Sequence, residues 1–192
     1  MKTIYLAAAM ASTLSLSAPA SAGFFDFTLA PFVGVSAGQS TIDASCPAAS
    51  SCDDTDMAWK IYGGLEVNEY IAMEFGYADL GEATSSGATV GTAEVNGMTI
   101  ALVGNFALSP RFSLIGRGGM NILNYDVVAT GAEPINEGDT DIAWSLGLGG
   151  QYNLTKALGL RLEWERFFDV GDEDTTGEAD VDLISAGIVY KF

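Results

Sequence analysis

Few residues of this chain could do chemistry, and four charged side chains stand out among them. Glu74, Arg117, Arg161 and Glu163 each lie in a stretch of apolar and glycine residues. Their charges sum to zero. Because buried charges are expected to be paired, these four residues predict a neutral network of ion pairs that makes charge tolerable inside a fold.

Catalytic and metal chemistry find little support. The chain has no histidine, which excludes Ser–His–Asp and Cys–His catalysis and His-ligated zinc. Its two cysteines, Cys46 and Cys52, lie close together in a small polar stretch and predict a disulfide in an oxidising compartment. A metal or redox site would need more ligands or CxxC spacing. We therefore expect no cofactor, no metal site and no catalytic residue.

Charge and composition limit both the fold and the partners. Among 192 residues, 25 are Asp or Glu and 8 are Lys or Arg, giving a net charge of −17, yet 48% are hydrophobic and 23 are glycine. A chain that is both this apolar and this strongly charged must keep its acidic residues apart from its apolar residues. No basic patch exists to neutralise phosphates, so nucleic acid is not an expected partner.

The first 22 residues predict a secretory signal peptide. Lys2 opens a positive region, the stretch from Ile4 to Met10 is apolar, and Ala20-Ser21-Ala22 has the small residues of a cleavage site. The alternative, an N-terminal membrane anchor, needs a longer apolar run. We expect a signal peptide over residues 1–22 and one exported domain over residues 23–192.

Apolar and polar residues alternate along the mature chain, and no period of 3.6 residues is sustained. The alternation predicts eight strands, over residues 27–39, 57–67, 70–80, 94–108, 111–125, 141–153, 158–168 and 181–192. One face of each strand is almost purely apolar, and the other carries charged, polar and small residues. Pro31 is awkward in the first strand, because it removes a ladder donor. Short turns alternate with long loops, and most acidic residues fall in or beside the long loops.

This arrangement favours an all-β fold, an eight-stranded antiparallel transmembrane β-barrel of up-and-down order. Aromatic residues on the apolar face predict two girdles around a lipid-facing band. The first girdle, toward the long loops, is Trp59, Trp144 and Trp164; the second, toward the short turns, is Phe106, Phe112, Tyr152, Tyr190 and Phe192. The alternative is a soluble exported β-sandwich whose aromatic residues are simply core.

Four motifs carry a resemblance to a known family. Residues 70–81 (YIAMEFGYADLG), 116–120 (GRGGM) and 161–164 (RLEW) resemble the third, fifth and seventh strands of the eight-stranded membrane barrel in the OmpA-like and small porin/opacity families. The end of the chain, with Tyr190 two residues before a final Phe192, resembles an outer-membrane assembly signal. It implies recognition by the barrel-assembly machinery. The resemblance covers nearly all of residues 27–192.

The resemblance implies a place in the outer membrane of a Gram-negative bacterium, among its lipid and lipopolysaccharide. It also implies an inner charge network, in which exchange of pairs among Glu74, Arg117 and Arg161 would open a narrow path. Two features depart from the family. Val103 stands in place of an inward lysine on the fourth strand, and we expect no peptidoglycan-binding domain after Phe192.

Three classes of function follow. The one that we favour is a non-enzymatic outer-membrane barrel that stabilises the envelope or presents its acidic loops to a surface ligand or host partner. The second is a narrow channel for ions or small solutes, gated by interior Glu–Arg pairs; a wide pore needs about 16 strands. The third, an outer-membrane enzyme, is disfavoured, because enzymes of this architecture that rely on a catalytic histidine cannot be built here.

Overall fold

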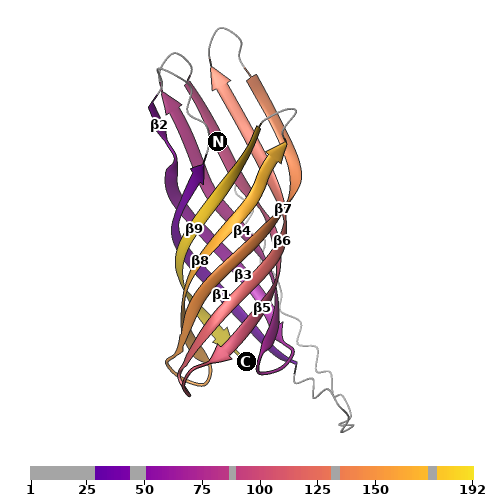
Figure 1. Ribbon diagram of the computed structural model, residues 1–192, viewed down its shortest axis with the longest axis vertical. Helices are drawn as coiled ribbons and strands as arrows, with labels where there is room; N and C mark the ends of the chain where they lie inside the picture. Colours follow the sequence, from indigo (N-terminus) through magenta and orange to yellow (C-terminus); the bar gives the residue numbers. More distant parts are fainter. Residues whose placement is uncertain (1–28, 44–50, 87–89, 131–134, 173–176) are drawn as a thin grey trace, which may run out of the picture.

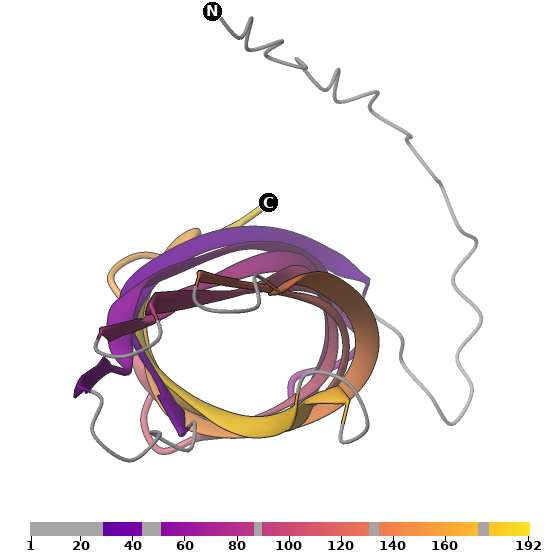
Figure 2. The same cartoon turned by 90° about the horizontal axis from the view of Figure 1, so that it is seen from above.

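The chain forms a closed antiparallel barrel in the computed structural model, which describes residues 29–43, 51–86, 90–130, 135–172 and 177–192 (Figures 1 and 2). The barrel strands are β1 (Ala30–Asp43), β3 (Thr55–Glu66), β4 (Ile71–Ser86), β5 (Val90–Ala107), β6 (Phe112–Thr130), β7 (Ile135–Asn153), β8 (Leu158–Asp172) and β9 (Gly177–Lys191). A short additional strand, β2 (Ser51–Asp53), pairs with the upper end of β4. The predicted eight-stranded, all-β barrel is confirmed.

Each barrel strand pairs with its neighbours in the chain, and β1 pairs with β9 to close the sheet. We call this β1–β9 pairing the seam; it runs from Phe32↔Lys191 to Asp43↔Asp180. The short turns and the last residue lie at the lower end of the barrel in Figure 1, and the opposite ends of the strands, such as Asp43 and Ser86, lie at the upper end. We use lower and upper for these two ends below.

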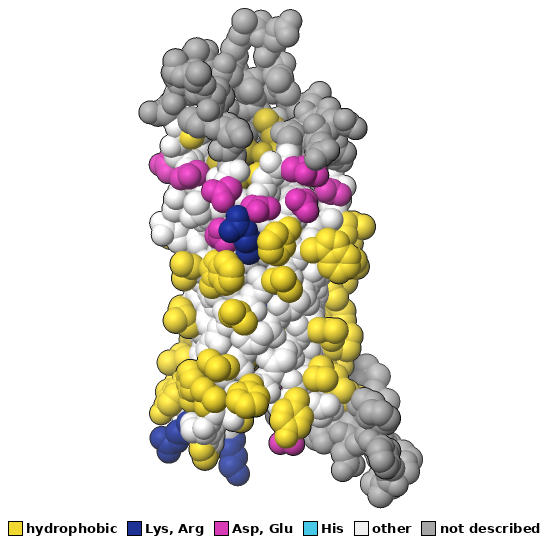
Figure 3. All heavy atoms as spheres, in the orientation of Figure 1, with side chains coloured by type: hydrophobic (Ala, Val, Ile, Leu, Met, Phe, Trp, Pro, Cys, Tyr) yellow, Lys and Arg dark blue, Asp and Glu magenta, His cyan; other side chains and the backbone are white. Residues whose placement is uncertain are grey.

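Side chains alternate between the outside and the inside of the barrel as a pleated strand requires. Large apolar side chains point outward from every barrel strand and remain exposed. In Figure 3 they cover the lower part of the barrel, while acidic side chains gather above them. Trp144 is 63% exposed and Phe106 is 64% exposed, which places both predicted girdles on the outer face. An apolar exterior of this kind fits lipid, and a soluble sandwich would bury it.

The strand ends differ from prediction mainly at the upper end. The predicted strand over residues 70–80 is β4, which continues to Ser86, and the one over 111–125 is β6, which continues to Thr130. Outward residues of these extensions, such as Glu82 and Asp126, are polar and exposed, so the hydrophobic alternation stops on the outer face while the backbone hydrogen bonds go on. The first strand begins later than predicted, at Ala30.

Pro31 is tolerated because of its place at the end of β1. Its carbonyl accepts a hydrogen bond from the Phe192 N–H at 3.1 Å, beyond Phe32↔Lys191, the lowest pair of the seam. The backbone N–H that Pro31 lacks therefore costs one bond at the very end of the seam and none within the ladder.

Two predictions lie wholly or partly outside the described residues. These are the signal peptide over residues 1–22 and the Cys46 side of the disulfide, whose other member, Cys52, lies on β2. Both stay predictions. Within the described part of the chain, we find no helical segment with the length and hydropathy of a membrane span.

Candidate functional site: a charged layer inside the barrel

Six charged side chains meet in the middle of the barrel interior, and all six residues are at least nine-tenths buried. We call them the ionic layer: Lys60 from β3, Glu74 from β4, Arg117 from β6, and Arg161, Glu163 and Glu165 from β8. Three are cations and three are anions, so the layer is neutral. The four residues singled out from the sequence are all in it, and the structure adds Lys60 and Glu165.

Arg117 is the centre of the ionic layer. Its guanidinium nitrogens lie 3.7 Å from Glu74 Oε2, 3.6 Å from Glu163 Oε1 and 3.3 Å from Glu165 Oε1. Arg117 has room inside the barrel because its register partner on the neighbouring strand β7 is Gly147, where a Cβ would lie 2.9 Å from the Arg117 Cγ. One cation therefore contacts all three carboxylates of the layer.

Arg161 holds the lower edge of the ionic layer. Its Nη1 donates to Glu74 Oε1, and its Nε donates to Gln151 Oε1 at 3.2 Å. The guanidinium also lies 5.3 Å from the centre of the Tyr62 ring, in cation–π geometry. Glu74 is thus shared between Arg161 and Arg117, the two arginines for which partner exchange is predicted.

Lys60 and Glu165 form the upper edge of the ionic layer. Lys60 Nζ donates to Glu165 Oε2 at 2.8 Å, and Ser145 Oγ donates to Glu165 Oε1 at 3.0 Å. The two charged residues are 105 positions apart in sequence. Their parity marks both as inward-facing, but only the tilt and stagger of the strands bring β3 and β8 to the same height.

A second layer of apolar side chains fills the barrel above the charges. We call it the outer apolar layer: Ile42, Ala58, Ala78, Leu80, Val95, Leu123, Tyr125, Ala143, Phe167, Val170, Ala179, Val181 and Leu183. The order can be followed along β8, where Arg161, Glu163 and Glu165 are succeeded by Phe167. Phe167 and Leu80 are fully buried. Sequence reasoning missed this layer, because each strand contributes only one to three apolar residues to the polar parity.

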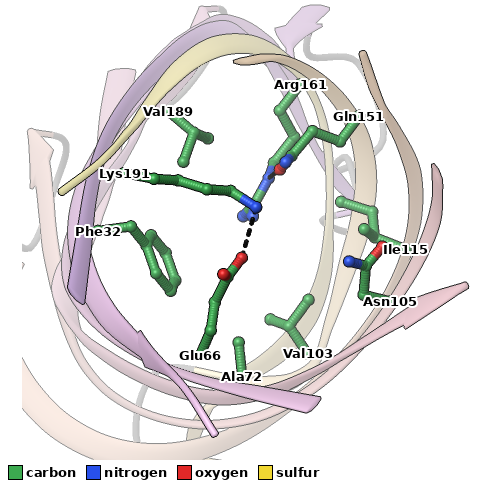
Figure 4. A pocket seen from close by; sticks show the side chains of 10 residues that line it. All are labelled: Phe32, Glu66, Ala72, Val103, Asn105, Ile115, Gln151, Arg161, Val189 and Lys191. Carbon is green, nitrogen blue, oxygen red and sulfur yellow. Dashed lines mark hydrogen bonds and ion pairs between the residues drawn. The ribbon is translucent and has the colours of Figure 1, made fainter. Parts of the chain in front are cut away.

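The lower mouth of the barrel is partly open. Below the charges lies a smaller group of buried apolar side chains: Phe32, Tyr62, Ala72, Val103, Ile115 and Val189. A cavity of about 20 Å³ lies among them, and its polar lining is Glu66, Asn105, Gln151, Arg161 and Lys191 (Figure 4). Lys191 and Glu66 form an ion pair across this mouth. Arg161 and Gln151 connect the cavity to the ionic layer.

A separate charged group lies on the outer surface at the upper end. Arg166 on β8 lies 3.3 Å from Asp43, 3.0 Å from Asp180 and 3.3 Å from Asp182. The Trp164 Nε1–H donates to Asp182 as well, at 3.1 Å. The side chain of Arg166 is 31% exposed, so this group is in contact with solvent. Among the described residues, no cluster of three acidic or cysteine side chains is arranged to hold a metal ion.

A comparison with protein families settles the ancestry of this barrel. The profile of the OmpA-like transmembrane domain matches residues 30–192, which is the whole of the barrel. The chain belongs to the OmpA-like transmembrane domain family. It is an outer-membrane β-barrel protein of a Gram-negative bacterium.

Known relatives of this OmpA-like barrel are much longer proteins. Outer membrane protein A of Shigella flexneri is 27% identical over 135 residues, covering 68% of this chain and 39% of the relative. The protein of the same name from Salmonella typhi matches to the same extent. This chain therefore spans about two fifths of the length of the curated relatives it matches.

Solved structures share the fold of this OmpA-like barrel at low sequence identity. Neisserial surface protein A has a TM-score of 0.64 at 16% identity, with 84% of this chain and 97% of that one covered. Ail, the attachment invasion locus protein of Yersinia pestis, solved with the heparin analogue sucrose octasulfate, has a TM-score of 0.56 at 14% identity, covering 85% and 99%. These likenesses concern the fold alone.

The remaining residues predicted from the resemblance lie at the lower end of the OmpA-like barrel. Tyr190 and Phe192 point outward, and their rings meet edge to face with centres 5.2 Å apart. Val103, the departure predicted from the resemblance, is buried and points inward. The third cation of the ionic layer is Lys60 on β3.

Proposed function

We propose that this protein is a non-enzymatic barrel with a structural and surface-presenting role in the outer membrane. The observation that carries the proposal is the filled interior: a neutral ionic layer lies beneath a layer of closely packed, buried apolar side chains. An eight-stranded barrel is just wide enough to be filled by its own side chains. Such an interior supplies rigidity, and the protein is left to act through its exposed upper end.

The upper end determines which partners we propose. Acidic side chains gather above the apolar band in Figure 3, and Arg166 lies among carboxylates. This surface would repel polyanions, so we propose cationic surface ligands, or anionic lipopolysaccharide bridged through shared divalent cations. Ail, by contrast, was solved with a sulfated sugar. At the lower end, Tyr190 and Phe192 would be recognised by the barrel-assembly machinery.

A second candidate function is a narrow channel for ions or small solutes. The observation that favours it is the sharing of Glu74, which has both Arg117 and Arg161 within 4.0 Å. Exchange of pairs among Glu74, Arg117, Arg161 and Glu163 would move charge without leaving any group unpaired. The outer apolar layer argues against conduction, because ions would have to cross it without polar partners.

Conductance of the refolded barrel distinguishes the two functions. Residues 23–192 would be refolded into planar lipid bilayers, with Arg161→Ala alongside and Arg166→Ala as the matched control on the outer surface. We expect all three proteins to fold and to remain silent. Discrete openings that change in Arg161→Ala but not in Arg166→Ala would overturn the structural role in favour of a gated channel. Failure to form a membrane-inserted barrel would contradict the fold itself.

A further inference from the structure

The wall of the barrel at the seam is lined inside by small residues at the height of the ionic layer. The inward positions there are Ser36 and Gly38 on β1, and Ser185 and Gly187 on β9. The strands on either side carry long inward side chains: Lys60 on β3 pairs in register with Ser36, and Glu163 on β8 pairs in register with Ser185. Long side chains thus flank a stretch of wall that has almost none. We call the space bounded by Ser36, Ser185, Tyr62, Lys60 and Glu163 the seam niche.

Four polar atoms of the seam niche find no hydrogen-bond partner among the residues that the structure describes. They are the hydroxyls of Ser36, Ser185 and Tyr62 and the Oε2 atom of Glu163. All four residues are at least 95% buried. Buried polar groups in folded proteins nearly always have a partner, in the protein or in ordered water. Four such atoms on one wall point to a shared partner.

The ion pairs around the seam niche are also too long for direct hydrogen bonds. Glu163 Oε2 lies 3.8 Å from Lys60 Nζ and 4.0 Å from Arg161 Nη1. Polar contacts longer than about 3.5 Å are those at which a bridging water is expected to be found. A water molecule needs two to four polar partners, and the three hydroxyls, the carboxylate and the ammonium group can supply that number.

Among the residues that the structure describes, the cavity that borders the ionic layer lies at the lower end of the barrel. The cavity at the lower mouth has a volume of about 20 Å³, enough for one water molecule, and Arg161 lines it. Above the charges, all eight barrel strands contribute buried apolar side chains or the Tyr125 ring to the outer apolar layer. Two buried polar residues lie beside this layer, and each donates to a backbone carbonyl: Ser40 to Leu80 and Asn121 to Ala143. An apolar packing of this kind excludes water.

We propose that the seam niche binds ordered water, and that this water exchanges with solvent through the lower mouth but not through the upper end of the barrel. The charged side chains would then be hydrated from the lower side alone. They would form half of a channel, whose upper side is closed by the outer apolar layer. The inference rests on the closed interior of the proposed function. It differs from a gate made of ion pairs, because the closing element is the apolar layer above them.

Side-specific thiol modification tests this proposal. In a background of Cys46→Ser with Cys52→Ser, the niche variant is Ser185→Cys, and the matched control is Ala58→Cys, a small, fully buried position in the outer apolar layer. Silver ions, which are small and react with thiols, are added to one side of vesicles that contain the refolded chain. Lys156 lies exposed in a short turn, so an impermeant amine reagent reports which way the barrel has inserted. Ser36→Cys repeats the measurement where Ser185→Cys fails to fold.

We expect Ser185→Cys to react when silver is added at the lower side, at a rate at least ten times that of Ala58→Cys, and not to react from the upper side. Reaction of Ser185→Cys from the upper side would overturn the seal. No reaction from either side in a folded barrel would overturn the water site. Conductance is a separate readout: openings in the unmodified protein would overturn the proposed function, whereas a silent barrel with an unreactive niche would overturn only the present proposal.

Discussion

Arg117 offers the sharpest test of the ionic layer, because its removal leaves three buried carboxylates with two cations. In Arg117→Met, Glu74, Glu163 and Glu165 each lose a contact at 3.3–3.7 Å, and the layer acquires a net charge of −1. Each such pair is worth about 4 kcal/mol at an effective dielectric constant near 20, most of it offset by the cost of desolvating the arginine. Removing one partner of a buried ion pair typically destabilises a protein by about 3–5 kcal/mol. We expect that loss in the free energy of unfolding.

The assay is equilibrium unfolding by urea in lipid vesicles, followed by tryptophan fluorescence. Arg166→Met is the matched control, since Arg166 also contacts three carboxylates but is 31% exposed; exposed pairs contribute about 0–1 kcal/mol. The double variant Arg117→Met with Glu165→Gln restores neutrality and should recover about half of the loss. Equal, small losses for Arg117→Met and Arg166→Met would refute the reasoning, because the interior charges would then be as well solvated as those on the surface.

Three further outcomes follow from the fold. Tryptophan fluorescence should be quenched more strongly by lipids brominated near the headgroup than by lipids brominated at the end of the acyl chain. The reason is that the protein has 3 tryptophans and all of them lie in the girdle toward the long loops. Equal quenching by the two lipids would place the barrel at another depth in the bilayer. Gly34→Ala should lower the free energy of unfolding by more than about 1 kcal/mol, because its Cβ would lie 2.4 Å from the Tyr62 ring. Gly63→Ala, whose Cβ would meet nothing closer than 3.5 Å, should leave the free energy of unfolding nearly unchanged, and similar losses at the two sites would contradict the steric cause. Phe167→Ala in the outer apolar layer should cost about 3–5 kcal/mol, measured by urea unfolding; a loss below about 1 kcal/mol would show that this layer is loosely packed.

Much of the barrel could be predicted because lipid imposes a strict pattern on the outer face. Outward residues such as Leu146 and Ile188 must be apolar wherever hydrocarbon touches them, so period 2 is strong there and the strand directions follow. Above the lipid-facing band, outward residues no longer have to be apolar. Thr84 and Ser85 still pair with Thr92 and Gly91, but nothing in their side chains marks them as strand.

The interior was predicted less completely, because it depends on how strands are staggered around the barrel. The parity of Glu74, Arg117, Arg161 and Glu163 was enough to expect them inside and near one another. The partnership of Lys60 with Glu165 depends on the relative heights of β3 and β8. The outer apolar layer left little local trace either, since an inward leucine such as Leu123 follows Gly119 and Asn121 on the polar parity of its own strand.

The seam has a consequence for how the barrel comes to exist. Phe32 and Lys191 are paired neighbours, yet almost the entire chain separates them, so this contact can form only after the other barrel strands have been brought into order. Until then β1 and β9 each present a row of unpaired N–H and C=O groups, which hydrocarbon penalises by several kcal/mol per group. The open sheet is therefore a state that the membrane core rejects, and closure has to accompany insertion. Two ion pairs then stabilise the seam after it has closed. Glu66 pairs with Lys191 at the lower end, and Asp43 pairs with Arg166 at the upper end.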